Sequence, residues 1–362
     1  MLQNKRIVEL DGLRGFAALM VVVSHYVGEP AHGIRAVALG WLGVNIFFVL
    51  SGFLIGSIIL EQHAQPGFFK RFYLKRAARI VPVYFVVFVL AIFAAGATTG
   101  HVWSDHPFSP FVYGSFTTNF FMSFSGADGG TWLKPTWTLA VEEQFYLLLP
   151  LLIVFTPRRF LVWVLGALWL GAIGFRIAFA GGNPIAALSL LPCRMDLLLS
   201  GVLIALAQRR FDLSRYRMAL RIAPLAAAIG LLLVAALTPA RYFTLFSGSI
   251  TSIGIAGFLL AIMHGAPEGA RFRAPWLRYF GQISYALYLV HQPVSGLLHG
   301  LLLNGAPDVA TPAQIAVTIL SAGVSVALAA ASWRWLESPI LGWAGRSVKT
   351  RKEPRLEVQG AA

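Results

Sequence analysis

The first long apolar stretch of the chain, residues 12–30, contains two side chains that membrane helices usually exclude, Arg14 and His25. Ionisable groups are costly in hydrocarbon, and they are retained where they pair with a partner or line a water-filled cavity. Arg14 and His25 are eleven residues apart, so on an α-helix they share one face with about 16 Å between them along the axis. One helix face could therefore contact a single ligand at two depths. A buried His25 bonded to a neighbouring carbonyl is the structural alternative.

Two adjacent carboxylates, Glu142 and Glu143, lie in the apolar segment WTLAVEEQFYLLLP at 137–150. Neighbouring residues of a helix point about 100° apart, so one carboxylate can face a cavity while the other pairs elsewhere. Glu142 shares a helix face with Phe145 and Tyr146, which follow it at three and four residues. The pattern indicates a functional carboxylate inside a membrane protein, and an ion pair with a buried arginine is the structural alternative.

Arg76 and Arg79 end the basic segment KRFYLKRAAR, just before an apolar run at 80–98. Their spacing of three residues places both side chains on one side of a helix, at its cytoplasmic end. Paired guanidinium groups match the oxygens of a phosphate, so this is a candidate anion site. Anchoring of the helix at the lipid headgroups is the alternative for each of them.

Several weaker features also place polar groups among apolar residues. Any one of them is more often explained by packing or by an internal ion pair, but together they predict a polar interior in a membrane bundle. Gly52, next to Ser51, would allow the close approach of another backbone. The candidate supporting residues are Ser51 in LSGFLIG, Glu143, Tyr146, Arg194 near Asp196 in PCRMDLLLSG, His291 in ISYALYLVHQPV, and Glu337 in WRWLESP, one helical turn after Arg334.

The composition is that of an integral membrane protein. Of 362 residues, 57% are hydrophobic and 12% are charged, about half the charged fraction of ordinary globular proteins. The apolar runs do not alternate with polar residues, which argues against an outer-membrane barrel. Windows of about 20 apolar residues, the length that spans a bilayer, predict an all-α polytopic bundle of about ten transmembrane helices. They lie near 12–30, 39–60, 80–98, 136–155, 160–180, 185–207, 221–239, 245–264, 279–303 and 313–335.

The distribution of basic residues predicts the orientation of this bundle. Of the 29 Lys and Arg, 22 lie in the terminal segments or in connections on the same side, and only Arg35, Lys134 and Arg241 lie on the other side. Lys and Arg are enriched in cytoplasmic loops, so both termini are expected in the cytoplasm. The net charge of +14 is therefore explained by the orientation of the helices in the membrane and does not indicate nucleic-acid binding.

The remaining segments set the expected domain boundaries. Residues 1–343 form one membrane domain whose first helix is retained, because no small-residue cleavage site follows it. The polar, basic tail at 344–362 is expected to be disordered. The outer connection at about 99–135 is rich in aromatic and hydroxyl side chains, which suit a sugar ring and equally suit an interfacial aromatic belt. Cys193 is the only cysteine, so an internal disulfide and a Cys-ligated metal site are excluded.

Taken together, these segments resemble the acyltransferase 3 family of bacterial integral-membrane acyltransferases. The resemblance extends in order from residue 10 to about residue 340, with Thr138 and Ala140 where serine is common in the family. Many members carry an extracytoplasmic C-terminal domain, and this chain resembles the stand-alone type because it stops after its last predicted helix. The motifs are LDGLRGFAALMVVVSHY, GVNIFFVLSGFLI, Arg76-x-x-Arg79 followed by Ile80 and Pro82-x-Tyr84, WTLAVEEQFYLLLP and ISYALYLVHQP.

The resemblance implies a multi-pass O-acetyltransferase of the bacterial cytoplasmic (inner) membrane. Such an enzyme takes an acyl group, usually acetyl, from cytoplasmic acetyl-CoA and places it on a hydroxyl of a cell-surface or lipid-linked glycan, such as lipopolysaccharide O-antigen or exopolysaccharide. Acetyl-CoA is then a donor substrate, and no permanently bound cofactor or metal is expected. Arg14 and His25 match the essential Arg/His motif of the family. Glu142 matches its carboxylate, and Arg76 and Arg79 match its Arg-x-x-Arg motif.

The chemistry of O-acylation is consistent with these residues. An alcohol is a poor nucleophile at neutral pH, and a neutral histidine is the side chain best suited to remove its proton. The hypothesis is that His25 is this general base and that Glu142 orients or charge-balances its imidazole. The three arginines would hold the phosphates of the donor. An acyl-enzyme step through His25 or Ser51 is left open.

A transporter or flippase for a glycolipid or an acyl precursor is the main alternative, because ten helices with buried Arg, His and Glu also suit a proton-coupled carrier. Many carriers show repeat symmetry and paired helices broken by Gly or Pro, and neither is visible in this sequence. A sensor or scaffold would need an output module, and none is recognisable. The acceptor hydroxyl, the choice among acetyl, succinyl and longer acyl groups, and the oligomeric state stay open at this stage.

Overall fold

The computed structural model describes residues 7–347, and every regular element in that part of the chain is a helix. The long helices are α1 (Val8–Val23), α2 (Gly40–Gln62), α3 (Phe68–Ala97), α6 (Thr136–Phe155), α7 (Leu161–Ala180), α9 (Leu191–Arg210), α10 (Arg217–Leu237), α11 (Ala240–Met263), α12 (Pro275–Leu303) and α13 (Pro312–Ser332). The short helices are α4 (Pro110–Gly114), α5 (Thr118–Ser125), α8 (Pro184–Ser189) and α14 (Ser338–Ser347). Two π-helical turns, η1 (Ser24–Gly28) and η5 (Trp333–Glu337), and three 3-10 turns, η2 (Arg35–Val37), η3 (Leu213–Tyr216) and η4 (Pro267–Arg273), complete the elements.

Ten helical segments in the described part of the chain are long and apolar enough to cross a membrane. They are the ten long helices, with α1 extended by η1, α9 preceded by α8, and α13 continued through η5 and α14. This confirms the predicted all-α bundle of ten spans. The reason is that bilayer thickness sets the length of an apolar run, so the number of spans can be counted before any packing is known.

Helix α3 begins at Phe68, well before the apolar run at 80–98 that predicted it. Gly67 precedes it with a left-handed backbone, φ 67°, where the chain turns into the helix. Lys, Arg and Ala are good helix formers, so the basic segment continues the helix instead of ending it. Arg76 and Arg79 therefore lie inside α3 and not at its end, which corrects the predicted boundary.

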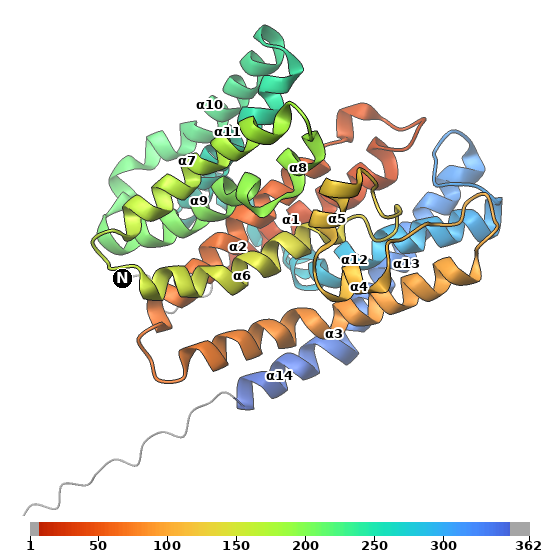
Figure 1. The fold of residues 1–362 in the computed structure, drawn as a ribbon, viewed down its shortest axis with the longest axis horizontal. Coiled ribbons are helices and arrows are strands. Elements are labelled where there is room, and N and C mark those ends of the chain that lie inside the picture. Colours follow the sequence, from red (N-terminus) through yellow and green to blue (C-terminus); the bar gives the residue numbers. More distant parts are fainter. Residues whose placement is uncertain (1–6, 348–362) are drawn as a thin grey trace, which may run out of the picture.

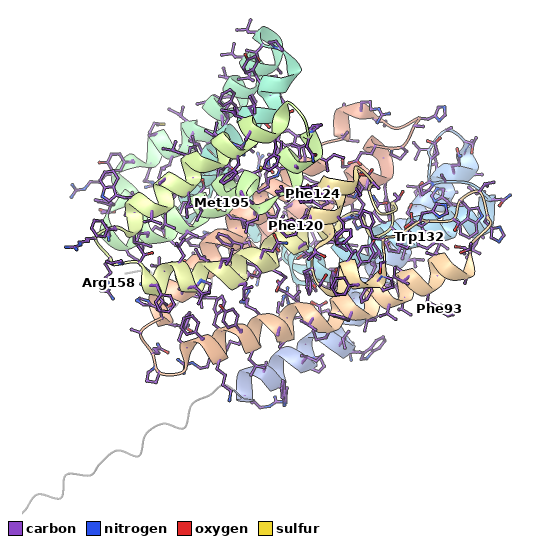
Figure 2. All side chains as sticks on the ribbon, viewed as in Figure 1. Phe93, Phe120, Phe124, Trp132, Arg158 and Met195 are labelled. Carbon is purple, nitrogen blue, oxygen red and sulfur yellow. The ribbon has the colours of Figure 1, made fainter. Side chains whose placement is uncertain are left out.

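Figure 1 shows the helices running roughly alongside one another, with α7, α9, α10 and α11 on one side of the bundle and α3, α12, α13 and α14 on the other. Helices α1 and α2 lie between these two groups. In Figure 2, Arg158 of the α6–α7 connection lies at one end of the bundle, and Trp132 lies toward the opposite end. The α6–α7 connection and the aromatic connection before α6 thus lie toward opposite ends of the bundle, while the assignment of one end to the cytoplasm stays a prediction.

The long connection between α3 and α6 is folded onto the bundle. Asp105 accepts hydrogen bonds from the backbone N–H groups of Thr131 (2.6 Å) and Trp132 (3.3 Å). Trp132 is buried against Gly296 of α12, where an added Cβ would lie 1.9 Å from the indole nitrogen. Phe124, which Figure 2 labels, is exposed. The aromatic residues of this connection therefore divide into a buried part that covers the bundle and an outer part that suits a membrane interface.

Helices α2 and α9 approach each other closely at two glycines, Gly52 and Gly201. A Cβ atom at Gly52 would lie 1.8 Å from the carbonyl oxygen of Leu198, and one at Gly201 would lie 2.1 Å from that of Val49. Small residues allow such contacts in membranes, where van der Waals packing holds helices together. The predicted close backbone approach at Gly52 is confirmed, and it fixes the position of the adjacent Ser51.

Gly52→Val is expected to lower the stability of the bundle in detergent by about 2 kcal/mol or more, because the added side chain forces α2 and α9 apart. Thermal unfolding followed by fluorescence-detected size exclusion measures this as a fall of the midpoint by several degrees. Gly171→Val in α7 is the matched control, since nothing lies within 4 Å of an added Cβ there, and its midpoint should not change. Equal midpoints for the two variants would contradict the proposed contact.

The end of the described chain lies beyond the predicted domain boundary. Helix α14 continues to Ser347, so residues 344–347, the first part of the predicted disordered tail, are helical. The rest of that tail, 348–362, lies outside the described residues, as do Lys5 and Arg6.

Candidate active site

A cavity lies among α1, α2, α3, α6 and α12. Together with the solvent open to it, its volume is about 800 Å³, which is within the range usual for small-ligand sites. The apolar part of its wall comes mainly from α2, including Phe47, Phe48 and Leu50. The structure brings together six of the predicted site residues in this wall, namely Arg14, Ser51, Arg76, Arg79, Glu142 and Tyr146. The remaining polar lining residues are Thr138, Ser284, Tyr285 and Tyr288.

Arg79 is held in place by protein partners. Its Nη1 atom lies 3.6 Å from Oε2 of Glu337, and its guanidinium packs over the rings of Tyr285 (6.0 Å) and Trp333 (5.7 Å). Glu337 is 2% exposed, so this ion pair is largely shielded from solvent. Glu337 pairs with Arg79 and not with Arg334, which is exposed, because the π-helical turn η5 changes the spacing that an α-helix would have given the two residues.

Arg14 and Arg76 line the same cavity, and their environment differs from that of Arg79. Within residues 7–347, neither guanidinium has a hydrogen bond or an ion pair. Guanidinium N–H groups left available in a partly desolvated cavity are suited to bind an anion, and their fork geometry matches phosphate oxygens. Of the two arginines of one motif, Arg79 is thus paired with Glu337, whereas Arg76 is available to a ligand.

Glu142 lies beside the hydroxyl groups of Ser51 and Tyr146, which are hydrogen-bonded to each other. It is also close enough to Arg14 and Arg76 to interact with them electrostatically. The predicted shared face of Glu142 and Tyr146 is confirmed, because both line the cavity. The carboxylate therefore offsets part of the positive charge of the cavity and orders the two hydroxyl groups beside it.

Glu143 and Arg194 lie outside the lining of the cavity. Glu143, the neighbour of Glu142, has a buried Oε1 atom without a hydrogen-bond partner in the described chain. Arg194 donates from Nε to the carbonyl oxygen of Leu188 (2.5 Å) and packs over the ring of Trp137 at 5.6 Å. The sequence placed one of two adjacent carboxylates in a cavity, and the structure identifies that one as Glu142.

His25 lies in the π-helical turn η1 and makes its contacts outside the cavity. Its Nδ1 atom lies 2.7 Å from Nε2 of His291, and the two rings are nearly parallel, at 6° with centroids 5.0 Å apart. Its Nε2 atom lies 3.6 Å from Oε1 of Glu29. The side chain of His25 is 18% exposed and that of Glu29 is 52% exposed, so this pair can be reached by solvent.

The predicted orientation of His25 by Glu142 is not found. Within the described residues, the hydrogen-bond and ion-pair partners of the His25 side chain are His291 and Glu29. Arg14 in α1 and His25 in the π-helical turn that follows Val23 lie at different depths of one span, about 16 Å apart along the axis of an α-helix. Arg14 therefore lines the cavity with Glu142, while His25 faces another part of α12.

Tyr288 stands between the cavity and the histidine pair. Its hydroxyl is hydrogen-bonded to the hydroxyl of Thr138 (2.8 Å) and donates to the carbonyl oxygen of Pro135 (3.2 Å), and both Tyr288 and Thr138 line the cavity. The ring of Tyr288 also lies 5.9 Å from the ring of His291, centroid to centroid. A ligand in the cavity would thus be separated from His25 by the Tyr288–Thr138 contact.

Three features of the structure were not among the sequence candidates. Glu29 follows His25 by four residues and Tyr288 precedes His291 by three, so helical spacing could have found both. The third is an ion pair between Arg176 and Asp196 (2.8 Å), fully buried among α7, α9 and α11. An arginine in the middle of an apolar helix signals a buried partner, but its sequence position does not say which one.

Sequence comparison relates the chain to known acyltransferases. A family model described as an acyltransferase domain matches residues 7–333. The peptidoglycan O-acetyltransferase OatA of Listeria monocytogenes is 29% identical over 360 residues, which cover 93% of this chain and 56% of that protein. A Bacillus subtilis protein named "Putative peptidoglycan O-acetyltransferase YrhL" is 29% identical over 372 residues, with 96% and 57% covered.

The chain spans little more than half the length of the curated relatives it matches. No solved structure matches it. The family match includes every residue of the cavity wall and both histidines of the His25–His291 pair. Since it extends over most of the sequence, the chain belongs to the acyltransferase 3 family.

Proposed function

We propose that the protein is a membrane O-acetyltransferase that moves an acetyl group from acetyl-CoA to a hydroxyl group of a cell-surface glycan. The observation that carries the proposal is an arginine-lined cavity with Tyr288 in its wall, next to the His25–His291 pair, in which His25 is partly exposed. This arrangement suits a reaction between an anionic donor held in the cavity and a neutral alcohol that arrives at His25. The names of the relatives support the same reaction class.

The cavity is suited to the donor. Coenzyme A carries several phosphate charges on a long, slender arm that ends in the thioester. Arg14 and Arg76 would bind phosphate oxygens, while Glu142 limits the repulsion among the guanidinium groups. The thioester arm would extend along the apolar wall toward Tyr288. The predicted orientation of the bundle places the basic connections, and with them the supply of acetyl-CoA, in the cytoplasm.

The transfer step uses His25 as a general base. Its imidazole takes the proton of the acceptor hydroxyl while that oxygen attacks the carbonyl carbon of the thioester. The C–O ester bond forms, the C–S bond breaks, and the proton passes from His25 to the departing sulfur, so an ester and free coenzyme A thiol are the products. Glu29 at 3.6 Å would stabilise the imidazolium formed in between. The Tyr288–Thr138 contact must open for the thioester to reach this position.

The acceptor is proposed as a glycan hydroxyl, with lipopolysaccharide O-antigen and exopolysaccharide as the classes the sequence suggested. The relatives are named for peptidoglycan, so peptidoglycan joins this set as a third class. All three present neutral hydroxyl groups on sugar rings, which the aromatic connection over the bundle is suited to contact. Proton NMR of each purified polysaccharide, from cells with and without the gene, would identify the acceptor by its ester signals.

The reaction itself is tested with purified protein in lipid vesicles supplied with acetyl-CoA labelled in the acetyl group. Release of coenzyme A thiol is expected only when a glycan acceptor is present, together with base-labile label in the glycan. A carrier or flippase would move a substrate across the bilayer without releasing thiol. Glycan-dependent thiol release that stays at the level of empty vesicles for all three acceptor classes would overturn the proposal.

A further inference from the structure

His291 on α12 is fully buried and has hydrogen-bonding partners for both of its ring nitrogens. Its Nδ1 atom lies 3.2 Å from the carbonyl oxygen of Leu287, one turn earlier in the same helix, and its Nε2 atom lies 2.7 Å from Nδ1 of His25. Among the described residues, no carboxylate contacts its ring. A neutral imidazole is expected in such a position, because burying an unpaired charge is costly.

The partners of His291 determine which of its nitrogens carries the proton. A carbonyl oxygen only accepts hydrogen bonds, so the bond to Leu287 requires the proton on Nδ1 of His291. A neutral imidazole has one N–H, so Nε2 of His291 must then be an acceptor. The bond between the rings therefore requires His25 to donate from its own Nδ1. In the neutral His25 that follows, Nε2 has the free lone pair.

This tautomer is the one that the proposed transfer step needs. Nε2 is the nitrogen of His25 that faces Glu29, whose side chain is 52% exposed. Oε1 of Glu29 also accepts a hydrogen bond from the Ser24 hydroxyl (2.8 Å), which fixes the carboxylate beside that edge. The opposite tautomer would place a proton on Nε2 and leave His25 without a base on the accessible side.

The frame around His291 is also tied to the helix that carries His25. The hydroxyl of Tyr26, the residue after His25, donates to the backbone carbonyl oxygen of His291 (2.6 Å) and contacts the hydroxyl of Ser325 on α13 (3.0 Å). The Tyr26 hydroxyl thus forms a second contact between the segment that carries His25 and the helix that carries His291. The nearly parallel rings, at 6°, are consistent with a fixed relative orientation.

We propose that His291 is a positioning residue that acts through His25: its bond to the Leu287 carbonyl sets the proton on Nδ1 of His25 and so leaves Nε2 free to act as the base. The inference rests on the proposed function for its catalytic meaning, but the tautomer itself is a property of the protein without substrate. It assigns a role to a residue that does not line the cavity and that no donor or acceptor need contact.

The tautomer is tested first on the unaltered protein, by solid-state ¹⁵N NMR of histidine-labelled protein in lipid bilayers. The His25 signals are identified by their loss in His25→Gln. A protonated Nδ1 and a non-protonated Nε2 are expected for His25. A protonated Nε2 in the neutral ring would overturn the inference, whatever the activity of the preparation.

The role is tested next with two variants of nearly equal size. His291→Gln can place an amide oxygen near the original Nε2 and still accept from His25, so its kcat should stay within about threefold of the unaltered protein. His291→Met has similar length but no comparable acceptor, so its kcat should fall by about 10- to 100-fold with the KM for acetyl-CoA unchanged. Equal kcat values for the two variants would refute the role, because a purely structural residue would not distinguish them.

His299 supplies the matched control on the same helix. It is also fully buried, its Nδ1 bonds the carbonyl oxygen of Ser295 four residues earlier (3.0 Å), and its Nε2 bonds the hydroxyl of Thr318 (3.2 Å). His299→Met should therefore lose comparable packing and leave kcat unchanged.

Failure of the proposed function can be told apart from failure of this inference. If the unaltered protein releases no thiol with any of the acceptors, the proposed function fails, while the NMR result still decides the tautomer of His25.

Discussion

Replacing His25 by alanine is expected to lower kcat for acetyl transfer by about 10²- to 10⁴-fold, the usual contribution of a general base. The KM for acetyl-CoA should change little, because His25 lies outside the cavity that would hold the donor. Initial rates of thiol release in vesicles, measured at saturating acetyl-CoA and glycan, give kcat directly. The large effect follows from the chemistry, since a neutral alcohol is a poor nucleophile without a base to take its proton.

His63→Ala is the control for this measurement. His63 follows α2, is half-buried and bonds the carbonyl oxygen of Ile59 (2.9 Å), and it belongs to neither the cavity wall nor the histidine pair. Its replacement should leave kcat unchanged and show that loss of a histidine alone does not impair the bundle. A correctly folded His25→Ala protein with kcat within threefold of the unaltered chain would exclude His25 as the base.

Arg76→Gln is expected to raise the KM for acetyl-CoA by about 10- to 100-fold, which corresponds to the roughly 1.5–3 kcal/mol of a hydrogen bond to a charged group. Arg76 has no protein ion pair within the described residues, so its loss should remove binding energy for the donor and leave the thermal midpoint nearly unchanged. Saturation kinetics in vesicles and thermal unfolding in detergent measure the two quantities. Raising the salt concentration should also raise the KM of the unaltered protein.

Lys75→Gln is the control for the loss of one positive charge, because Lys75 is exposed on the same helix and does not line the cavity. Its KM should stay near that of the unaltered protein. If Arg76→Gln and Lys75→Gln have the same KM, Arg76 is an anchor for the helix and not a ligand of the donor.

Arg79 should behave differently from Arg76, although the two belong to one motif. Its ion pair with Glu337 is shielded, and removal of one partner of such a pair leaves an uncompensated charge that costs about 3–5 kcal/mol. Arg79→Gln is therefore expected to lower the thermal midpoint, and addition of Glu337→Gln to restore part of it. The recovery in the double variant separates the structural role of Arg79 from any contact with the donor.

The architecture was largely predictable from the sequence. The ten spans follow from the lengths of the apolar runs, which the bilayer imposes on each helix separately. The shared helix face of Glu142 and Tyr146, and the close contact at Gly52, follow from spacing and residue size within one helix. In each case the physical cause is local, so it can be read before the helices are placed against one another.

The partners of the candidate site residues were decided only by the tertiary structure. His291 meets His25 from a position 266 residues away, and Glu337 reaches Arg79 from the last helices of the bundle. Periodicity shows which face of a helix is polar but not which face of another helix it will meet. The π-helical turn η5 also changes the relative positions of Arg334 and Glu337 on their helix, and no pattern in the sequence predicted that turn.

The sequence by itself therefore determined the membrane architecture and singled out Arg14 and His25 as ionisable groups within one apolar span. The structure decided that these two groups have different surroundings, with Arg14 in the cavity wall together with Glu142 and His25 between His291 and Glu29. The physical reason is that a buried polar group is costly until it finds a partner, and partners are chosen by packing among all the helices at once.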